Sequence, residues 1–282
     1  MEKNIWEKEE YYKDIENTHS DDLIKEDSIF LHFIELLKEN KPASVLDVGC
    51  GEGWLIDQFS KRVDIVQSFT GIDVSSIGLK RAEGKNISKA KFIHYDGRIF
   101  PFTNNSFDVA LSSFVFEHLS DPMTTFNEMS RVVKPGGLII IACPNFGSPL
   151  FKSPCNKENR LLLMVSRFFK EFMPRVYFKN DFYWNKVVPI ELPAHVHISD
   201  YDTLCEPSLS SFQKFLINHK DKYSIVKIDS LWDSYDYDKI FTSGRLSLLK
   251  KGLVNLAKNL GLKKMLRFQY FGSFFFVAIK KV

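Results

Sequence analysis

The sequence predicts a doubly wound α/β fold built around a mostly parallel β-sheet. From 43 to 143, short apolar runs alternate with amphipathic segments, a pattern typical of parallel strands joined by right-handed helical crossovers. The first run, Val45–Val48, is followed by glycines at alternate positions from Gly49 to Gly53. A later run ends in Asp73. Since ligands of open α/β sheets bind at the carboxyl ends of the strands, these observations predict a binding site at that edge.

The glycine-rich segment predicts close contact between the backbone and a ligand. Glycine has no Cβ atom, so it permits a sharp turn and lets a ligand approach the main chain. The helix that follows begins with free N–H groups. The dinucleotide fingerprint needs a glycine three residues after its second glycine, and this chain has Trp54 there. Because Asp73 can accept hydrogen bonds from ribose hydroxyls, the pattern favours a nucleoside over a dinucleotide.

The other elements are expected from hydrophobic periodicity and from capping residues. A helical segment over 5–39 ends before Pro42, and a Pro-punctuated, aromatic-rich insertion separates the core from the last third of the chain. The expected helices are one from Trp54, then 76–84, 121–133, 159–172 and 208–219, and a further helix carrying Leu246 to Leu260. The expected strands, besides those already named, are 92–97, 107–113, 138–143, 223–228 and 274–279.

The composition is that of a globular protein close to charge balance. The 282 residues are 44% hydrophobic with a net charge of +3, so the whole chain does not resemble a polyanion-binding protein. From Phe241 to Val282 there are nine Lys or Arg residues and no acid. Three interpretations of this region stay open: a solvated helix face, a helix resting on anionic membrane, and a site for a phosphate-bearing substrate.

The cysteines and the start of the chain favour a reducing cytoplasm. The four cysteines have no paired metal-ligand spacing, and Cys50 and Cys143 are expected as buried core thiols. The first residues lack the apolar core of a signal peptide. No apolar run reaches the ~18 residues of a membrane span. We therefore expect a cytoplasmic location, with peripheral contact at the inner face of the membrane as the alternative.

The segment from Asp47 to Gly53, acid-x-Gly-x-Gly-x-Gly, resembles motif I of the class I S-adenosylmethionine (SAM) dependent methyltransferases. Other segments resemble the small-molecule branch of that family, the type 11 methyltransferase domain. These segments are 92–97, 107–113, 116–122 and 128–137. The resemblance is close over about 43 to 144 and weak from 145 onward.

The resemblance implies a Rossmann-like, doubly wound seven-stranded sheet. Its last strand is antiparallel and lies between strands five and six. The Pro-punctuated insertion after the fifth strand is longer than in many relatives, and we interpret it as a helical substrate lid. The resemblance also implies SAM as the cofactor, with Asp47 near the ammonium group, Asp73 on the ribose and Asp96 near the adenine amino group. The cofactor-binding residues expected from the resemblance are Asp47, Gly49, Cys50, Gly51, Gly53, Asp73, Val74, Asp96, Gly97 and Ser113.

The expected organisation is one structural domain in four parts. An N-terminal helical cap covers 1–40, and the SAM-binding core covers 41–144. A lid insertion follows over 145–200. The last part, 201–282, completes the sheet and contains a basic helical insertion.

Three histidines are the catalytic candidates. His118 follows the expected fourth strand, at the edge that faces the SAM methyl group in this fold, and histidine titrates near neutral pH. Helix capping or packing against neighbouring phenylalanines is the alternative role for His118. His195 and His197 share one face of an extended segment after the lid. No metal is expected, because two histidines lack a third ligand.

These inferences predict methyl transfer from SAM to a small-molecule or glycan acceptor at a hydroxyl oxygen. The alternatives are a quinone-type C-methyltransferase at the membrane surface and a catalytically inactive SAM-binding regulatory protein. The acceptor is expected to be lipid-linked or phosphate-bearing in two of the three interpretations of the basic region. A lipid-linked acceptor would be accompanied by peripheral membrane contact through 243–267. No nucleic-acid substrate is expected, since Ser112–Val115 replaces the motif of base-methylating enzymes.

Overall fold

The structure is a computed structural model, and five stretches of the chain are described in it. These described residues are 5–12, 29–172, 184–190, 200–231 and 271–282. Two sequence predictions lie outside them: the histidine pair His195 and His197, and the basic helix over 246–260.

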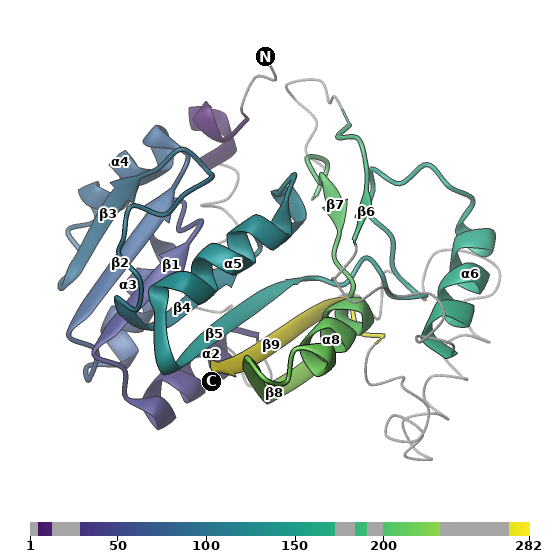
Figure 1. Ribbon diagram of the computed structural model, residues 1–282. Coiled ribbons are helices and arrows are strands. Elements are labelled where there is room, and N and C mark those ends of the chain that lie inside the picture. The colour runs from purple at the N-terminus through teal and green to yellow at the C-terminus, as the bar shows by residue number, and fades with distance from the viewer. Residues whose placement is uncertain (1–4, 13–28, 173–183, 191–199, 232–270) are drawn as a thin grey trace.

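The described residues form a seven-stranded sheet in the order β3-β2-β1-β4-β5-β9-β8. The first five strands are parallel, and β9 pairs antiparallel with both β5 and β8. The predicted Rossmann-like, doubly wound fold with an antiparallel last strand is therefore confirmed (Figure 1). The strands are β1 Ser44–Val48, β2 Ser68–Asp73, β3 Ala90–His94, β4 Phe107–Ser113, β5 Val133–Pro144, β8 Tyr223–Leu231 and β9 Phe274–Lys281.

Helices cover both faces of this sheet, as Figure 1 shows. Residues of α5 (Pro122–Val132) and α8 (Leu209–Asn218) pack in one hydrophobic core. Residues of α2 (Ile29–Asn40), α3 (Trp54–Arg62) and α4 (Ser76–Gly84) pack in the other. The remaining elements are η1 Ile5–Glu7, η3 Phe116–His118, α6 Arg160–Phe172, β6 Asn185–Lys186 and β7 Cys205–Glu206.

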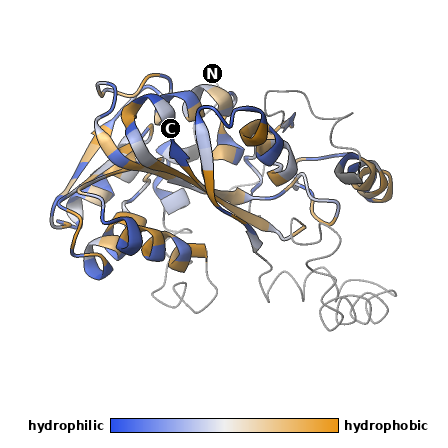
Figure 2. Ribbon diagram, turned by 60° about the horizontal axis from the view of Figure 1, so that its bottom comes forward, coloured by the Kyte–Doolittle hydropathy of each residue, from blue (hydrophilic) through white to orange (hydrophobic). Residues whose placement is uncertain are grey.

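The two cores follow from the period-two alternation of the strands. In β5, Ile139 and Ile141 belong to the core with α5 and α8, whereas Leu138 and Ile140 belong to the core with α2 and α3. Successive side chains of a strand point to opposite faces, so a run that is apolar throughout must be covered on both sides. Figure 2 shows the hydrophobic residues concentrated along these strands. Cys143 and Cys50 are buried thiols, as predicted.

Capping residues fix where the helices nearest the carboxyl edge begin. The side chain of Ser75 accepts a hydrogen bond from the Gly78 N–H, and that of Asp121 accepts one from Thr124, with Pro122 in the first turn. The sequence expectation of a helix over 76–84 matches α4. The lid helix predicted over 159–172 is α6 within one residue. The two-residue pairing of β6 with β7 was not expected from the sequence.

Candidate active site

The glycine loop after β1 is a sharp turn tied to the end of β2. The N–H groups of Gly49 and Cys50 both donate to the Ile72 carbonyl oxygen, at 2.8 and 3.1 Å. Gly49 has φ +76°, and a Cβ atom there would lie 2.3 Å from Cγ2 of Val115. Only glycine fits this position, because the conformation is left-handed and the neighbouring side chain leaves no room. The loop therefore presents bare backbone at the carboxyl edge.

Asp73 joins the loop to the start of α4. The Gly51 N–H donates to its Oδ2, and the Ser75 N–H donates to its Oδ1, both at 2.8 Å. The side chain is 8% exposed. Burial raises the pKa of Asp73, although these N–H donors act in the opposite direction. Each carboxylate oxygen keeps further acceptor capacity for a ligand hydroxyl.

A second acid, Asp47, is buried next to the same loop. Its side chain is only 2% exposed. Burial, and then repulsion from Asp73, raise the pKa of Asp47 to about 8. Two carboxyl groups that are both hard to ionise lie beside bare backbone. The site therefore favours a ligand that brings positive charge.

The loop after β4 packs against the glycine loop. The Oγ of Ser113 is buried and has no hydrogen-bond partner among the described residues. Phe114 has a positive φ of 56°, and Val115 packs on Gly49. Buried hydroxyl groups are normally hydrogen-bonded. An unsatisfied Ser113 hydroxyl at this position is thus available to a ligand.

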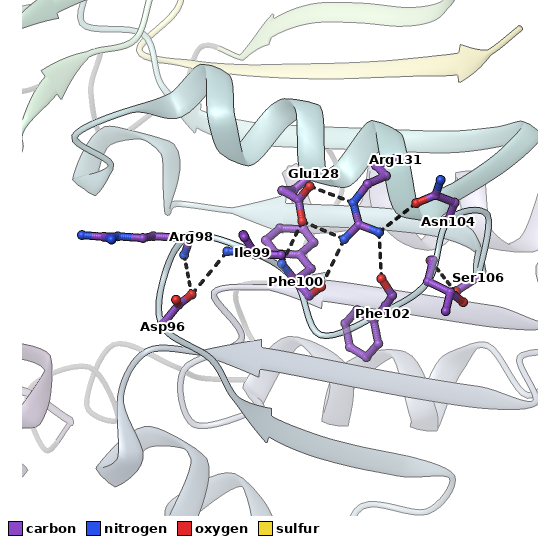
Figure 3. A network of polar contacts seen from close by, with 10 residues as sticks. Asp96, Arg98, Ile99, Phe100, Phe102, Asn104, Ser106, Glu128 and Arg131 are labelled. Atoms are coloured by element: carbon purple, nitrogen blue, oxygen red, sulfur yellow. Dashed lines mark hydrogen bonds and ion pairs between the residues drawn. The ribbon is translucent and has the colours of Figure 1, made fainter.

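Asp96 and Gly97 lie where the sequence predicted them, just after β3. Gly97 has φ +78°, and a Cβ atom there would lie 3.1 Å from Cγ1 of Val74. The Asp96 carboxylate accepts the N–H groups of Arg98 at 2.9 Å and Ile99 at 3.3 Å, and these two bonds lower its pKa. Asp96 is exposed, with one carboxylate oxygen engaged in this turn (Figure 3). The adenine role of Asp96 stays a prediction.

An Arg131–Glu128 pair holds the segment that carries Asp96, which crosses from β3 to β4 without a helix. Arg131 donates to both oxygens of Glu128 and to the carbonyl oxygens of Phe100 and Phe102, at 2.7 to 3.1 Å. The Phe100 N–H donates to Glu128 in turn, at 2.8 Å. Figure 3 shows the guanidinium group enclosed by these acceptors. Sequence reasoning missed this positioning role, because the carbonyl acceptors have no sequence signature.

Residues 5–12 lie across the carboxyl edge. The carboxylate of Glu7 accepts hydrogen bonds from the N–H and the hydroxyl of Ser76, each at 2.8 Å. Tyr12 is buried, and its ring lies beside Gly51 and Gly78. The sequence predicted an N-terminal cap but did not identify which residues make these contacts.

His118, at the end of η3, faces two carboxyl groups. Its Nδ1 lies 3.2 Å from Oδ2 of Asp202, and its Nε2 lies 3.8 Å from Oε1 of Glu117. The ring also contacts Trp6 edge-on, with 5.9 Å between centroids. Burial raises the pKa of Glu117 well above its usual value. Sequence reasoning identified His118 but not Asp202.

Two negative findings concern the described residues only. No group of three or more His, Cys, Asp or Glu side chains is arranged to hold a metal ion there. In the same part of the chain, each helix is too short or too polar to cross a membrane.

The fold defines a class: a Rossmann-like α/β protein with a glycine loop and strand-end acids at the carboxyl edge of its sheet. Residues 46–141 match the family model described as a methyltransferase domain, of type 11. Residues 46–141 are thus similar to that family, which confirms the class I methyltransferase resemblance.

The chain is similar to curated proteins in sequence and to solved structures in fold. Demethylmenaquinone methyltransferases of Staphylococcus aureus strains are 35% identical over 137 residues, which is 48% of this chain and 53% of theirs. The chain thus spans about half the length of these curated relatives. A solved structure titled as a putative methyltransferase from Bacillus halodurans has a TM-score of 0.51 at 16% identity, covering 89% of this chain and 97% of that one. The plantazolicin methyltransferase BpumL, solved with SAH, has a TM-score of 0.52 at 17% identity, covering 98% and 92%. The two solved structures share the fold.

Proposed function

We propose that this chain transfers a methyl group from SAM to a small-molecule or glycan acceptor, at a hydroxyl oxygen. The observation that carries the proposal is the buried pair of acids, Asp47 and Asp73, beside a loop of bare backbone. SAM carries an ammonium group and a sulfonium centre, and a buried carboxyl group with a raised pKa gains most from a cationic partner. The residues therefore fit this cofactor.

Each loop of the site has a role in the proposal. Asp47 would hold the ammonium group, Asp73 the ribose hydroxyls and Asp96 the adenine amino group. The Ser113 hydroxyl, which has no partner among the described residues, would satisfy its hydrogen bond on the bound ligand. When bound, SAM supplies a methyl group on a positively charged sulfur, already activated for displacement. The protein's main contribution is then orientation, worth ~7 kcal/mol or more.

His118 would act as the general base for the acceptor hydroxyl. It lies at the same carboxyl edge as the glycine loop, since η3 directly follows Val115, which contacts Gly49. A well-placed base contributes about 10²- to 10⁴-fold to a rate. His118→Ala should reduce turnover by that order with little change in SAM affinity. Full activity of this variant would leave His118 with a packing role only.

The first experiment is calorimetric titration of the purified protein with SAM and, separately, with NAD. Micromolar SAM binding without NAD binding is the expected result. A methyl-transfer screen with isotopically labelled SAM and a panel of sugars, nucleotide sugars and quinols then identifies the acceptor class. Absence of SAM binding, both alone and with each acceptor present, would overturn the proposal.

Quinone-type C-methylation is the second candidate, favoured by one observation. The 35%-identical relatives are named demethylmenaquinone methyltransferases, and the matched segment covers 53% of their length. Mass spectrometry of the methylated product separates the candidates, because a carbon-bound methyl group resists the cleavage that removes an ether methyl. SAM binding with no transfer to any acceptor would support the inactive regulatory alternative. Membrane contact through 243–267 stays a prediction from sequence charge.

A further inference from the structure

His118 is held between three elements that converge at the carboxyl edge. Trp6 of η1 packs edge-on against its ring. Glu117 precedes it in η3, and Asp202 approaches from the segment after the lid. The phenol of Tyr11 lies near enough to interact with both carboxyl groups, and burial raises its pKa well above the usual value. Of the two carboxyl groups that face the ring, that of Asp202 lies at the shorter distance, 3.2 Å against 3.8 Å.

The two ring nitrogens of His118 have different surroundings. Nδ1 faces two oxygens of one residue: Oδ2 of Asp202 at 3.2 Å and its main-chain carbonyl at 3.5 Å. Both oxygens can accept a hydrogen bond, so they favour a hydrogen on Nδ1. Nε2 then carries the lone pair, and its nearest carboxyl oxygen is that of Glu117, at 3.8 Å. This distance is too long for a hydrogen bond, so Nε2 is free to accept a proton from an acceptor.

Backbone contacts hold Asp202 in place. The Leu204 N–H donates to the Glu117 carbonyl oxygen at 2.8 Å, and the Cys205 thiol donates to the Phe116 carbonyl oxygen at 3.2 Å. These two contacts fix the segment after Asp202 against η3. Asp202 itself is 9% exposed, and its Oδ2 has no conventional hydrogen bond among the described residues. The Nδ1 of His118, at 3.2 Å, is the cation-forming group that this buried oxygen faces.

From this geometry we infer that Asp202 is the positioning residue for His118: it orients the imidazole with Nδ1–H toward the segment after the lid and stabilises the imidazolium. The inference rests on the proposed function. In the proton-transfer step, the acceptor O–H bond breaks, the proton moves to Nε2 and the electron pair stays on the acceptor oxygen. The carboxylate of Asp202 offsets the positive charge that forms on the ring.

The decisive variants differ in one functional group. Asp202→Asn removes the negative charge at nearly constant volume, and Asp202→Glu restores a carboxylate. Asp200→Asn is the matched control, because this substitution removes a carboxylate two residues away from Asp202. The positive φ of 62° at Asp200 also suits asparagine. Asp202→Asn should lower kcat about 10- to 100-fold with the KM for SAM unchanged, and should move the acid limb of the pH–rate profile to lower pH. Asp202→Glu should recover part of kcat, and Asp200→Asn should match the parent.

An NMR titration of the His118 ring tests the pair without any assay of methyl transfer. The titration midpoint of this ring should fall in Asp202→Asn and stay at the parent value in Asp200→Asn. Equal midpoints in the two variants would overturn the inference, even if the protein proves to be a methyltransferase. A lowered midpoint in a protein that transfers no methyl group would instead refute the proposed function and leave the pair intact. Far-UV circular dichroism and SAM titration identify any variant that fails to fold.

Discussion

Substitution of Asp47 by Asn should make the ligand-free protein more stable and SAM binding weaker. Asp47 is 2% exposed, and its pKa is raised from 3.8 to about 8 by burial and by Asp73. Between these two values the folded state keeps a proton that the unfolded chain releases. The free energy of unfolding therefore falls as the pH rises through this window.

The magnitude follows from the width of the window. Between pH 4 and pH 7 lie roughly three pH units of this window, and each unit changes the free energy of unfolding by about 1.36 kcal/mol. At pH 7 the wild-type protein is therefore about 4 kcal/mol less stable than at pH 4. Asparagine is neutral at every pH and has nearly the same shape. Asp47→Asn should thus unfold like the parent near pH 4 and gain up to ~4 kcal/mol over it by pH 7.

Two measurements test this reasoning. Urea unfolding at pH 5, 7 and 8 should show a stability difference that grows with pH. Calorimetry of SAM binding at pH 7, in two buffers of different ionisation enthalpy, should show proton release for the parent, because the ammonium group favours ionised Asp47. The variant should release no proton from this residue and bind SAM at least tenfold more weakly. A stability difference independent of pH, together with equal proton release, would refute the assignment of Asp47.

Three further predictions concern other parts of the site. Asp73→Ala should reduce SAM affinity by about 10²-fold, because charge-assisted hydrogen bonds to the ribose are lost. Circular dichroism should show that this variant is folded, and an unchanged affinity in calorimetry would contradict the ribose role of Asp73. Burial disfavours ionisation of Asp108, but hydrogen bonds from Lys134 and Ser44 outweigh burial and lower the pKa of Asp108. Asp108→Asn should therefore destabilise the protein above about pH 4, and the loss of stability should vanish as the pH falls below about 4. A loss in thermal unfolding that does not depend on pH would argue against this role of Asp108. Arg131→Met should cost about 2 kcal/mol in urea unfolding, because the carbonyl oxygens of the loop before β4 lose their donor, whereas the same change at Arg98 should cost far less.

The fold was predictable because its signals are local. The run Leu138–Cys143 predicts a buried strand whatever surrounds it, and Ser75 before α4 is a cap that depends on its own next residues. The antiparallel placement of β9 between β5 and β8 came from the family resemblance. No periodicity in the run over 274–279 distinguishes an antiparallel strand from a parallel one.

The site was predictable only in part, for the same reason. Gly49, Asp73 and His118 stand in motifs whose members are close in sequence. Asp202 meets His118 across 84 positions, and no local pattern marks a carboxylate for a distant imidazole. The Arg131 contacts to Phe100 and Phe102 depend on main-chain oxygens, which every residue carries.

The position of β9 sets an order of events during synthesis. Within the described sheet β8 pairs with β9 alone, and β9 also completes the hydrogen bonding of β5. β8 ends at Leu231 and β9 begins at Phe274, so at ~5–20 residues per second the ribosome needs roughly 2 to 9 s to reach the strand that joins them. During this interval β5 and β8 lack the strand that completes their hydrogen bonding, and unpaired strand edges of this kind favour aggregation of a nascent chain.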